Sequence, residues 1–278
     1  WSDGADKTRY MALPNSTTID IDGWDDWQFP VGSVLVKNFY LDDKIIETRL
    51  FMHRLNLSTN VGNWQGFTYE WDGNLEVATR VKGGKTTVIA DQQWTFPSET
   101  QCLLCHTESA GFVLGLETAQ LNGLYHSPPV NQLEHLNRIG MFTTPLADPE
   151  VLPALVDPLN ESADINDRAR AYLHSNCANC HQPNTGVPSA MDLRYMTLLG
   201  DTNACDFTPY SGDLGIGPNA RLIAPGAPEN SVILERMSRR DFAKMPPLSS
   251  FIADEDGVAL MTEWIQQLEP ESCNDTSC

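Results

Sequence analysis

One short pattern, C-x-x-C-H, occurs twice and constrains this chain more than any other feature. The copies are Cys102-Leu-Leu-Cys105-His106, the first motif, and Cys177-Ala-Asn-Cys180-His181, the second motif. This pattern is the attachment signature of c-type haem. Two thiols on one helical turn form thioethers to a single porphyrin, and the adjacent histidine supplies an axial nitrogen to its iron. We therefore predict two covalently bound haem c groups.

Other roles for paired cysteines fit this pattern less well. A structural zinc site can use two C-x-x-C pairs separated by about 15–20 residues, but the two motifs lie much farther apart. A thioredoxin-like redox pair does not need the following histidine, and it sits in a βαβ unit that this sequence does not predict. Disulfides within each C-x-x-C are a third alternative. Two copies, each followed directly by histidine, favour haem over all three.

Met245 is the predicted sixth ligand of the haem at the second motif. It precedes Pro246 and Pro247 and lies before the last predicted helix. Because proline fixes φ and restricts its predecessor, the segment is stiff and extended, which suits a thioether presented to iron. A His/Met ligand pair stabilises ferrous haem and raises its potential. The alternative for a lone methionine is core filler.

The sixth ligand at the first motif has several candidates, because no Met-Pro-Pro follows this motif. They are Met52, His53, His126, His135 and Met141. We favour Met52, which lies in a predicted strand, so that a residue of the sheet would cap this iron. A five-coordinate iron is the alternative, and it would open the site to peroxide or other small ligands.

Two features of the second half bear less directly on chemistry. Arg221 is predicted to pair with a haem propionate, since a guanidinium matches carboxylate geometry, with an ordinary surface arginine as the alternative. The glycine-rich run 212–217 is not a nucleotide loop, because no strand and helix frame it as that motif requires. No catalytic residue is predicted.

The first hundred residues predict β-structure and the remainder predicts helices. Alternating apolar residues and turn signals indicate strands over 31–40, 45–55, 66–71, 76–80 and 86–89. Ser98 and Gln101 form a capping box at the start of a helix. Further apolar spacing predicts helices over 115–121, 131–139, 166–176, 231–237 and 255–268. The last of these is strongly amphipathic.

These elements predict an α+β fold in two domains. A Pro- and Asp-rich linker over 144–158 separates a β-rich haem-1 domain, residues 1–150, from a cytochrome c-like haem-2 domain, residues 151–278. The first domain would be a small antiparallel β-sheet with haem-binding helices. The second has the order of parts of a mainly α class I cytochrome c: helix, C-x-x-C-H, long loop, Met-Pro-Pro and terminal helix.

The net charge of −19 and the apolar pattern limit the partners and the location. Like charges repel nucleic acid and anionic membrane surfaces, so neither is an expected partner. A redox protein with a basic docking patch would be attracted. No apolar run is long enough to span a membrane. The chain starts at Trp1 without a basic-then-apolar leader, so we expect that a signal peptide was removed and that the protein is periplasmic or extracellular.

Three cysteines lie outside the two motifs: Cys205, Cys273 and Cys278. An odd number in an exported chain suggests one disulfide and one leftover thiol. Cys205 and Cys273 could join the long loop of the second motif to the end of the last helix. Cys278 could compete with Cys273 for Cys205, stay reduced or bond another chain.

Over nearly its whole length the chain resembles a family of bacterial dihaem c-type cytochromes. The stretches that carry the resemblance are 29–37, 47–50, 64–71, 96–99 and 114–122 in the first half, and 170–181, 212–216, 221–226, 231–236 and 245–248 in the second. The resemblance implies two haems and a C-terminal class I cytochrome c domain. Relatives are sometimes joined to propellers like those of quinoprotein sugar dehydrogenases, which implies electron acceptance from an exported dehydrogenase.

The predicted function is electron transfer to and from another redox protein, an exported dehydrogenase or another cytochrome. One alternative is a dihaem peroxidase-type enzyme, in which His53 or His126 could act beside an open iron. Another is a homo-oligomer, in which the chain is a haem-stacking subunit of an extracellular filament.

Overall fold

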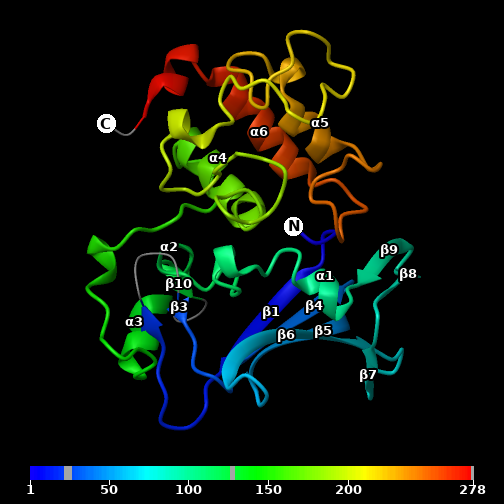
Figure 1. The fold of residues 1–278 in the computed structure, drawn as a ribbon, viewed down its shortest axis with the longest axis vertical. Helices are drawn as coiled ribbons and strands as arrows, with labels where there is room; N and C mark the ends of the chain where they lie inside the picture. Colours follow the sequence, from blue (N-terminus) through cyan, green and yellow to red (C-terminus); the bar gives the residue numbers. More distant parts are fainter. Residues whose placement is uncertain (22–26, 126–128, 277–278) are drawn as a thin grey trace. The chain divides into compact units, whose positions relative to one another are not determined.

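The computed structural model describes residues 1–21, 27–125 and 129–276. It contains two compact units (Figure 1). The N-terminal unit is Gly4–Leu155, and the C-terminal unit is Val156–Cys278 together with Trp1–Asp3. The division falls after Leu155, a few residues beyond the boundary placed at residue 150 from the sequence.

A five-stranded antiparallel sheet in the order β1-β4-β5-β6-β7 forms the centre of the N-terminal unit (Figure 1). A two-residue turn joins β4 to β5, and Asp42 and Asp43 both adopt positive φ there, as such a hairpin turn requires. The strands are β1 (Asp6–Ala12), β4 (Val34–Leu41), β5 (Lys44–Asn56), β6 (Val61–Trp71) and β7 (Ala78–Val81).

Short elements complete this unit. The strand pairs are β2 (Asp20–Ile21) with β3 (Trp27–Gln28), β8 (Lys85–Ile89) with β9 (Gln92–Phe96), and β10 (Leu124–Tyr125) with β11 (Val130–Asn131). The helices are α1 (Glu99–Cys102), η1 (Glu108–Ala110), α2 (Thr118–Leu121), α3 (Gln132–Arg138) and η2 (Pro149–Val151). Two apolar clusters hold these parts together, one around Phe51 and Trp64 and the other around Phe39 and Trp94.

One face of the sheet lies beside the first motif and carries both charged and aromatic side chains. Side chains alternate between the two faces of a strand, so Glu47, Arg49, Phe51 and His53 of β5 share this face. Phe51 lies opposite Gly66 of β6 across it. The same face therefore runs from a charged region at Glu47 and Arg49 to an aromatic region at Phe51.

Helices and long loops build the C-terminal unit. α4 (Ile165–Leu173) continues into a π-helical turn, η3 (His174–Ala178). α5 (Val232–Ser238) and α6 (Glu255–Gln267) follow later, and α6 packs against both α4 and α5. The short 3-10 helices are η4 (Leu199–Thr202), η5 (Pro228–Asn230) and η6 (Pro270–Asn274). Met261, Trp264 and Ile265 of α6 are fully buried in the core, which matches the apolar face predicted for this helix.

The first three residues belong to the C-terminal unit. Asp3 is buried, and its Oδ1 accepts a hydrogen bond of 2.9 Å from the backbone N–H of Ile252. The indole Nε1 of Trp1 donates to the carbonyl oxygen of Ile252 at 3.0 Å. These contacts add a segment to this unit that no local pattern in the sequence predicts.

The predicted fold class is wrong. The described part of the chain is sheet-rich, with six α-helices and 25% helical residues, and it does not contain a mainly α class I cytochrome c domain. In the C-terminal unit α4, α5 and α6 cover only 9, 7 and 13 residues. Glycine and proline are frequent between residues 182 and 228, and both disfavour helix. This segment instead forms loops and turns that tertiary contacts hold in place.

The crossing of α4 and α6 depends on a residue without a side chain. A Cβ atom on Gly257 would lie 2.3 Å from the hydroxyl oxygen of Tyr172. That hydroxyl donates to Oδ2 of Asp254 at 2.9 Å, and Asp254 caps α6 by accepting from the N–H of Gly257. The glycine thus lets the Tyr172 ring lie directly on the first turn of α6.

Gly257→Ala is expected to lower the free energy of unfolding by about 1–3 kcal/mol, because a methyl group in this contact forces the helix or the ring to shift. Helix propensity alone would favour alanine by about 1 kcal/mol. A loss of stability in urea unfolding would therefore identify the contact with Tyr172 as the cause. A variant at least as stable as the parent would contradict the tight crossing.

None of the helices that the structure describes is both long enough and apolar enough to cross a membrane.

Candidate functional site

The first motif lies on one helical turn that begins with a defined cap. The Ser98 hydroxyl accepts from the N–H of Gln101 at 3.2 Å, and the Gln101 side chain accepts from the N–H of Ser98 at 2.8 Å, so the predicted capping box is confirmed. The backbone N–H groups of Cys105 and His106 donate to the carbonyl of Cys102 at 3.3 and 3.1 Å. These bonds close one helical turn that carries both cysteines and the histidine.

The second motif has the same local geometry in a different setting. The N–H groups of Cys180 and His181 donate to the carbonyl of Cys177 at 3.1 and 2.9 Å. The turn follows α4 through the π-helical η3. Such π turns are rare and occur often at functional sites. Both motifs therefore fold into equivalent turns, although their flanking elements differ.

His106 is held in one orientation and one tautomer. Its Nδ1 lies 2.6 Å from the carbonyl oxygen of Phe112, which can only accept, so Nδ1 carries the proton and Nε2 carries the lone pair. The ring packs on Phe51 with centroids 4.3 Å apart. Desolvation lowers the pKa of His106 to about 4, so the imidazole is neutral at pH 7. A neutral imidazole oriented through Nδ1 is the usual form of a histidine that ligates a metal.

His181 is neutral for the same reason but lacks the orienting bond. Burial, followed by the positive charge of Arg236, lowers its pKa. Its Nδ1 is buried and has no hydrogen-bond partner in the part of the chain that the structure describes. A buried polar atom without a partner costs about 1–3 kcal/mol. An imidazole that keeps this unfavourable burial within the motif is consistent with a functional role for His181.

Met245 is hydrogen-bonded to α5, the helix that carries Arg236. Its backbone N–H donates to the carbonyl of Arg236 on α5 at 2.8 Å, and Arg236 donates to the carbonyl of Ala243 at 3.0 Å. Met245 is half-buried. Because the charge of Arg236 also acts on His181, α5 is a common neighbour of the histidine and of the methionine segment.

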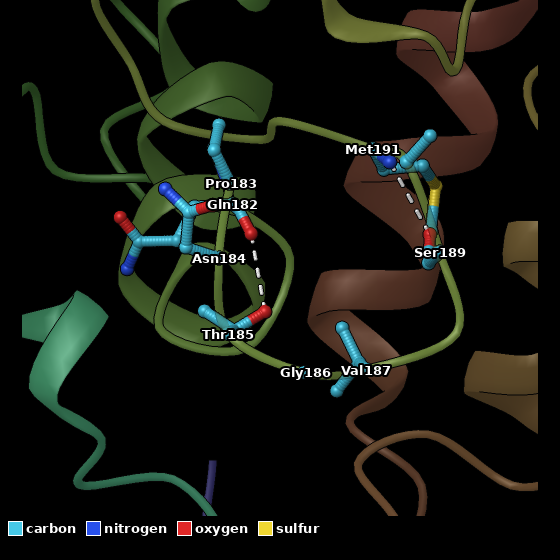
Figure 2. A pocket seen from close by; sticks show the side chains of 9 residues that line it. Gln182, Pro183, Asn184, Thr185, Gly186, Val187, Ser189 and Met191 are labelled. Carbon is cyan, nitrogen blue, oxygen red and sulfur yellow. Dashed lines mark hydrogen bonds between the residues drawn. The ribbon is translucent and has the colours of Figure 1, made fainter.

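The loop after His181 borders an open pocket of about 280 Å³, lined by residues between Gln182 and Met191 (Figure 2). The Thr185 hydroxyl donates to the carbonyl of Cys180 at 2.6 Å and to that of Gln182 at 3.1 Å. These bonds fold the loop back onto the second motif. The hollow therefore lies directly beside its cysteine and histidine.

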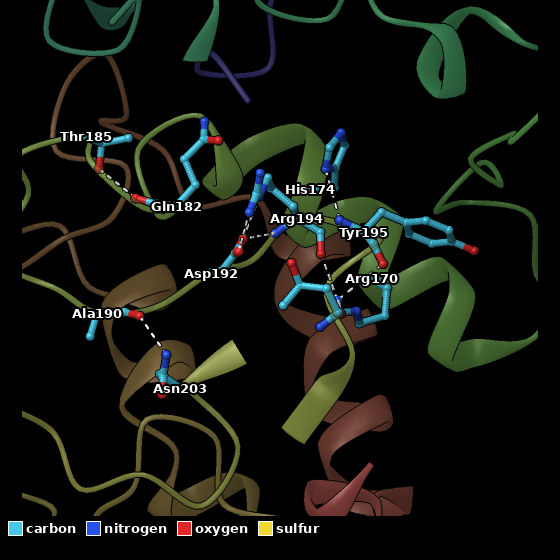
Figure 3. Close-up of polar contacts among 10 residues, drawn as sticks. Arg170, His174, Gln182, Thr185, Ala190, Asp192, Arg194, Tyr195 and Asn203 are labelled. Atoms are coloured by element: carbon cyan, nitrogen blue, oxygen red, sulfur yellow. Dashed lines mark hydrogen bonds and ion pairs between the residues drawn. The ribbon is translucent and has the colours of Figure 1, made fainter. Parts of the chain in front are cut away.

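A second segment, residues 192–197, is fixed against α4 and η3 (Figure 3). The buried guanidinium of Arg170 donates to the carbonyls of Arg194, Tyr195 and Thr197. The N–H of Tyr195 donates to Nδ1 of His174 at 3.1 Å. The N–H of Leu193 donates to the carbonyl of His181 at 2.9 Å. Arg170 thus has a structural role that the sequence reasoning missed, because its partners are backbone atoms of a distant loop.

The structure does not bring Met52 to the face on which His106 packs. Met52 lies next to Phe51 in β5, so its side chain points to the opposite face of the sheet. His53 shares the face of Phe51, where its ring stacks on Trp64 at 4.8 Å and its Nδ1 lies 2.9 Å from the carbonyl of Phe29.

The other candidates for this ligand have different surroundings. His135 is exposed, with Nδ1 3.0 Å from the guanidinium of Arg138. Met141 packs against the apolar cluster that contains Phe51. His126 lies outside the described residues. Of the two candidate methionines, Met141 is therefore the one that packs on the cluster of Phe51, which contacts His106.

Three further residues that were singled out from the sequence have partners in the structure. Arg221 donates from Nε to Oδ1 of Asp206 at 3.0 Å, so its charge has a carboxylate partner within the chain. Cys205 and Cys273 form a disulfide with Cα atoms 5.4 Å apart. Cys278 lies outside the described residues.

Three cationic side chains are neighbours on the face of the sheet that contacts the first motif. The register places Arg9 of β1 opposite Lys37 of β4, and Lys37 opposite Arg49 of β5. We call these three residues the cation row. The spacing within each strand gives no sign of it, because cross-strand register decides which residues become neighbours.

Only one member of the cation row is neutralised. Arg49 donates to both carboxylate oxygens of the fully buried Glu47, at 2.7 and 3.0 Å. Within the described ranges no carboxylate pairs with Arg9 or Lys37; the Lys37 ammonium lies 5.3 Å from the centre of the Phe39 ring. Desolvation, then the charges of Arg9 and Arg49, lowers the pKa of Lys37 to about 7.

Without haem, the wild-type chain is expected to gain stability with rising pH relative to a Lys37→Met variant. The folded state releases the Lys37 proton near pH 7, whereas the unfolded chain holds it up to about pH 10.5. In that window the unfolded chain binds more protons, so the free energy of unfolding rises with pH. Urea midpoints of both chains at about pH 6, 7.5 and 9 would measure the difference. Parallel pH profiles would contradict the assigned burial of Lys37.

Among the residues that the structure describes, no three or more His, Cys, Asp or Glu side chains gather in a group suited to a metal ion. No protein-family model, no curated protein and no solved structure matches this chain.

Proposed function

We propose that this protein is a dihaem c-type cytochrome that carries single electrons outside the cytoplasm. The observation that carries the proposal is the shared geometry of the two motifs, each a single turn with two cysteines and a neutral histidine. Cys102, Cys105 and His106 would hold one haem. Cys177, Cys180 and His181 would hold the other, and Met245 would be the second axial ligand there.

The residues at both motifs fit this cofactor. Burial raises the pKa of the Cys102 thiol, and it raises that of the Cys177 thiol to about 12, so both cysteines are kept protonated. A protonated thiol is not the thiolate form that zinc binds, so the burial of these two sulfurs disfavours a zinc site. The hydrogen bond from His106 to Phe112 orients the imidazole, and the orphaned Nδ1 of His181 marks a buried ring without a structural partner. When bound, each haem supplies a one-electron change at its iron.

Location and partner follow from charge and from the disulfide. The bridge between Cys205 and Cys273 fits an oxidising compartment, so the protein would act in the periplasm or outside the cell. A net charge of −19 would attract a redox protein with a basic docking patch, an exported dehydrogenase or another cytochrome. Association that slows steeply with added salt would support this steering.

The test is to produce the full chain with a c-type cytochrome maturation system and to count its haems. A pyridine haemochrome spectrum and the intact mass should show two covalent haems on the wild-type chain. The paired changes Cys102→Ala with Cys105→Ala and Cys177→Ala with Cys180→Ala should each leave one. Colourless protein, or zinc held by these sulfurs, would refute the proposal.

A second measurement separates electron transfer from peroxidase chemistry. Cyanide and peroxide are added to the ferric protein while its absorption spectrum is recorded. An electron carrier should keep its spectrum and show no peroxide turnover. Rapid ligand binding by a high-spin haem, with turnover, would make the protein an enzyme.

Gly66→Ala is expected to impair haem attachment at the first motif only. A Cβ at position 66 would lie 2.7 Å from the sulfur of Cys102, so the thiol would have to move from its place over the sheet. Intact mass should then show a larger share of chains with one haem. Gly73→Ala is the matched control, because a Cβ there meets no atom within 4 Å. Full double attachment in the Gly66→Ala variant would show that the sulfur position is not critical.

A further inference from the structure

The cation row lies beside the first motif on the same face of the sheet. Arg49 is two residues from Phe51 along β5, so both side chains project from one face. Phe51 contacts the ring of His106, and Gly66 opposite it lies under the sulfur of Cys102. The charges of Lys37 and Arg49 both act on His106, which agrees with this proximity.

The spacing of the row matches the extent of a porphyrin. Cys102 lies over β6, while Lys37 is on β4 and Arg9 is on β1, two and three strands away in the sheet order. With neighbouring strands about 4.8 Å apart, the sideways offsets are roughly 10 and 14 Å. The thioether edge and the propionate edge are on opposite sides of a haem, so a group tethered at Cys102 can extend its carboxylates toward this row.

The positive charge of the cation row also favours the binding of an anion. Glu47 neutralises Arg49, which leaves the basic side chains of Arg9 and Lys37 without a carboxylate in the described chain. Lys37 is in a middle strand and half-buried, and burying an unpaired ammonium among cations is costly. The rest of the protein is strongly acidic, with 37 Asp and Glu against 18 Lys and Arg. Two carboxylates beside Arg9 and Lys37 would keep Lys37 protonated, and the two side chains would then neutralise both of them.

We propose that Arg9 and Lys37 bind the two propionate carboxylates of the haem attached at the first motif. This inference rests on the function proposed above. It assigns the propionate contacts to the sheet of the N-terminal unit, and Arg221, which pairs with Asp206, is not needed for this haem. Lys37 and Arg9 are binding residues in this assignment, and they take no part in attaching the haem.

The test uses the full haem-loaded chain with one cation removed at a time. Lys37→Met and Arg9→Gln each remove a charge from the row. Lys44→Gln is the matched control, because Lys44 is exposed at the start of β5. Lys37→Arg keeps the charge and should behave as wild type. Intact mass counts haems, spectroelectrochemical titration gives the reduction equilibrium of each haem, and resonance Raman spectroscopy reports hydrogen bonding at the propionates.

We expect two haems in every chain. In Lys37→Met and Arg9→Gln, the reduction equilibrium constant of one haem should fall by about tenfold, because a bare propionate charge at roughly 10 Å favours ferric iron. The propionate bending band of that haem should shift. The other haem, and both haems of Lys44→Gln, should keep wild-type values.

The outcomes separate the two proposals. Two haems in every variant, with unchanged equilibria and an unchanged propionate band, would overturn the propionate assignment and leave the dihaem proposal standing. A wild-type chain without covalent haem would overturn the proposed function itself. Lys37→Met is expected to fold, because methionine has a similar volume and no carboxylate of the described chain loses an ion-pair partner. If it does not fold, the comparison of Arg9→Gln with Lys37→Arg gives the same decision.

Discussion

Glu47→Gln is expected to lower the free energy of unfolding by about 3 kcal/mol, because it removes one partner of a buried ion pair. Glu47 has no exposed surface and accepts two hydrogen bonds from Arg49 and one of 3.0 Å from Nε1 of Trp94. The glutamine is nearly isosteric, so little packing is lost. What changes is charge, since Arg49 would then stand beside Lys37 and Arg9 without its counter-ion.

A double-mutant cycle isolates this electrostatic effect. Lys37→Met should recover part of the stability that Glu47→Gln loses, because it removes a like charge next to Arg49. Glu70→Gln is the matched control for the carboxylate, since the ion pair of Glu70 with Lys85 is much more exposed and such pairs are worth about 0–1 kcal/mol. Urea unfolding measures all four variants. Additive effects of Glu47→Gln and Lys37→Met would contradict the coupling across the sheet.

Replacing both Cys205 and Cys273 with serine is expected to destabilise the C-terminal unit by about 4 kcal/mol. The bridge joins residues 68 apart in the sequence, and the entropy of closing so long a loop in the unfolded chain sets this size. Cys205 is buried beside η4, and Cys273 lies in η6. The N–H of Gly200 in η4 also donates to the carbonyl of Asp275 at 2.8 Å, so the bridge and this bond hold the same two segments together.

Reduction of the wild-type chain is the control for this prediction. A thiol reagent should lower the urea midpoint of the wild type to that of the double serine variant and should leave the variant itself unchanged. Covalent haem at both motifs would be unaffected, since thioethers resist such reagents. A variant as stable as the wild type would mean that the loops of this unit are held by the core alone.

Local pattern predicted four of the five strands of the central sheet and several helices, and it failed where strand pairing or long loops decide. The alternation in 45–55 and the amphipathic spacing in 255–268 correspond to β5 and α6. β1 is largely exposed and polar, so it is a strand only because it pairs with β4, and the sequence reasoning missed it. The prediction of a mainly α second domain was wrong, because it inferred the helix content from the order of the motifs along the chain.

The candidate site was predictable only in its local part. The two C-x-x-C-H turns are short-range chemistry, and a capping box could be read directly from Ser98 and Gln101. Met52 was favoured from its place in a strand, but which face it takes depends on the packing of Phe51 against His106. Arg221 was predicted to pair with a propionate because nothing in the sequence indicates its ion pair with Asp206, which only the structure shows.

The sequence by itself determined the features that fit within a few residues: two C-x-x-C-H motifs, with their histidines, and the Met-Pro-Pro segment. Tertiary structure alone decided which distant groups surround them. Arg9, Lys37 and Arg49 are separated by long stretches of chain and become neighbours through strand register. Local bonding depends on residues within one turn, whereas register and burial depend on the packing of the whole sheet, and so the cation row could be found only in the folded chain.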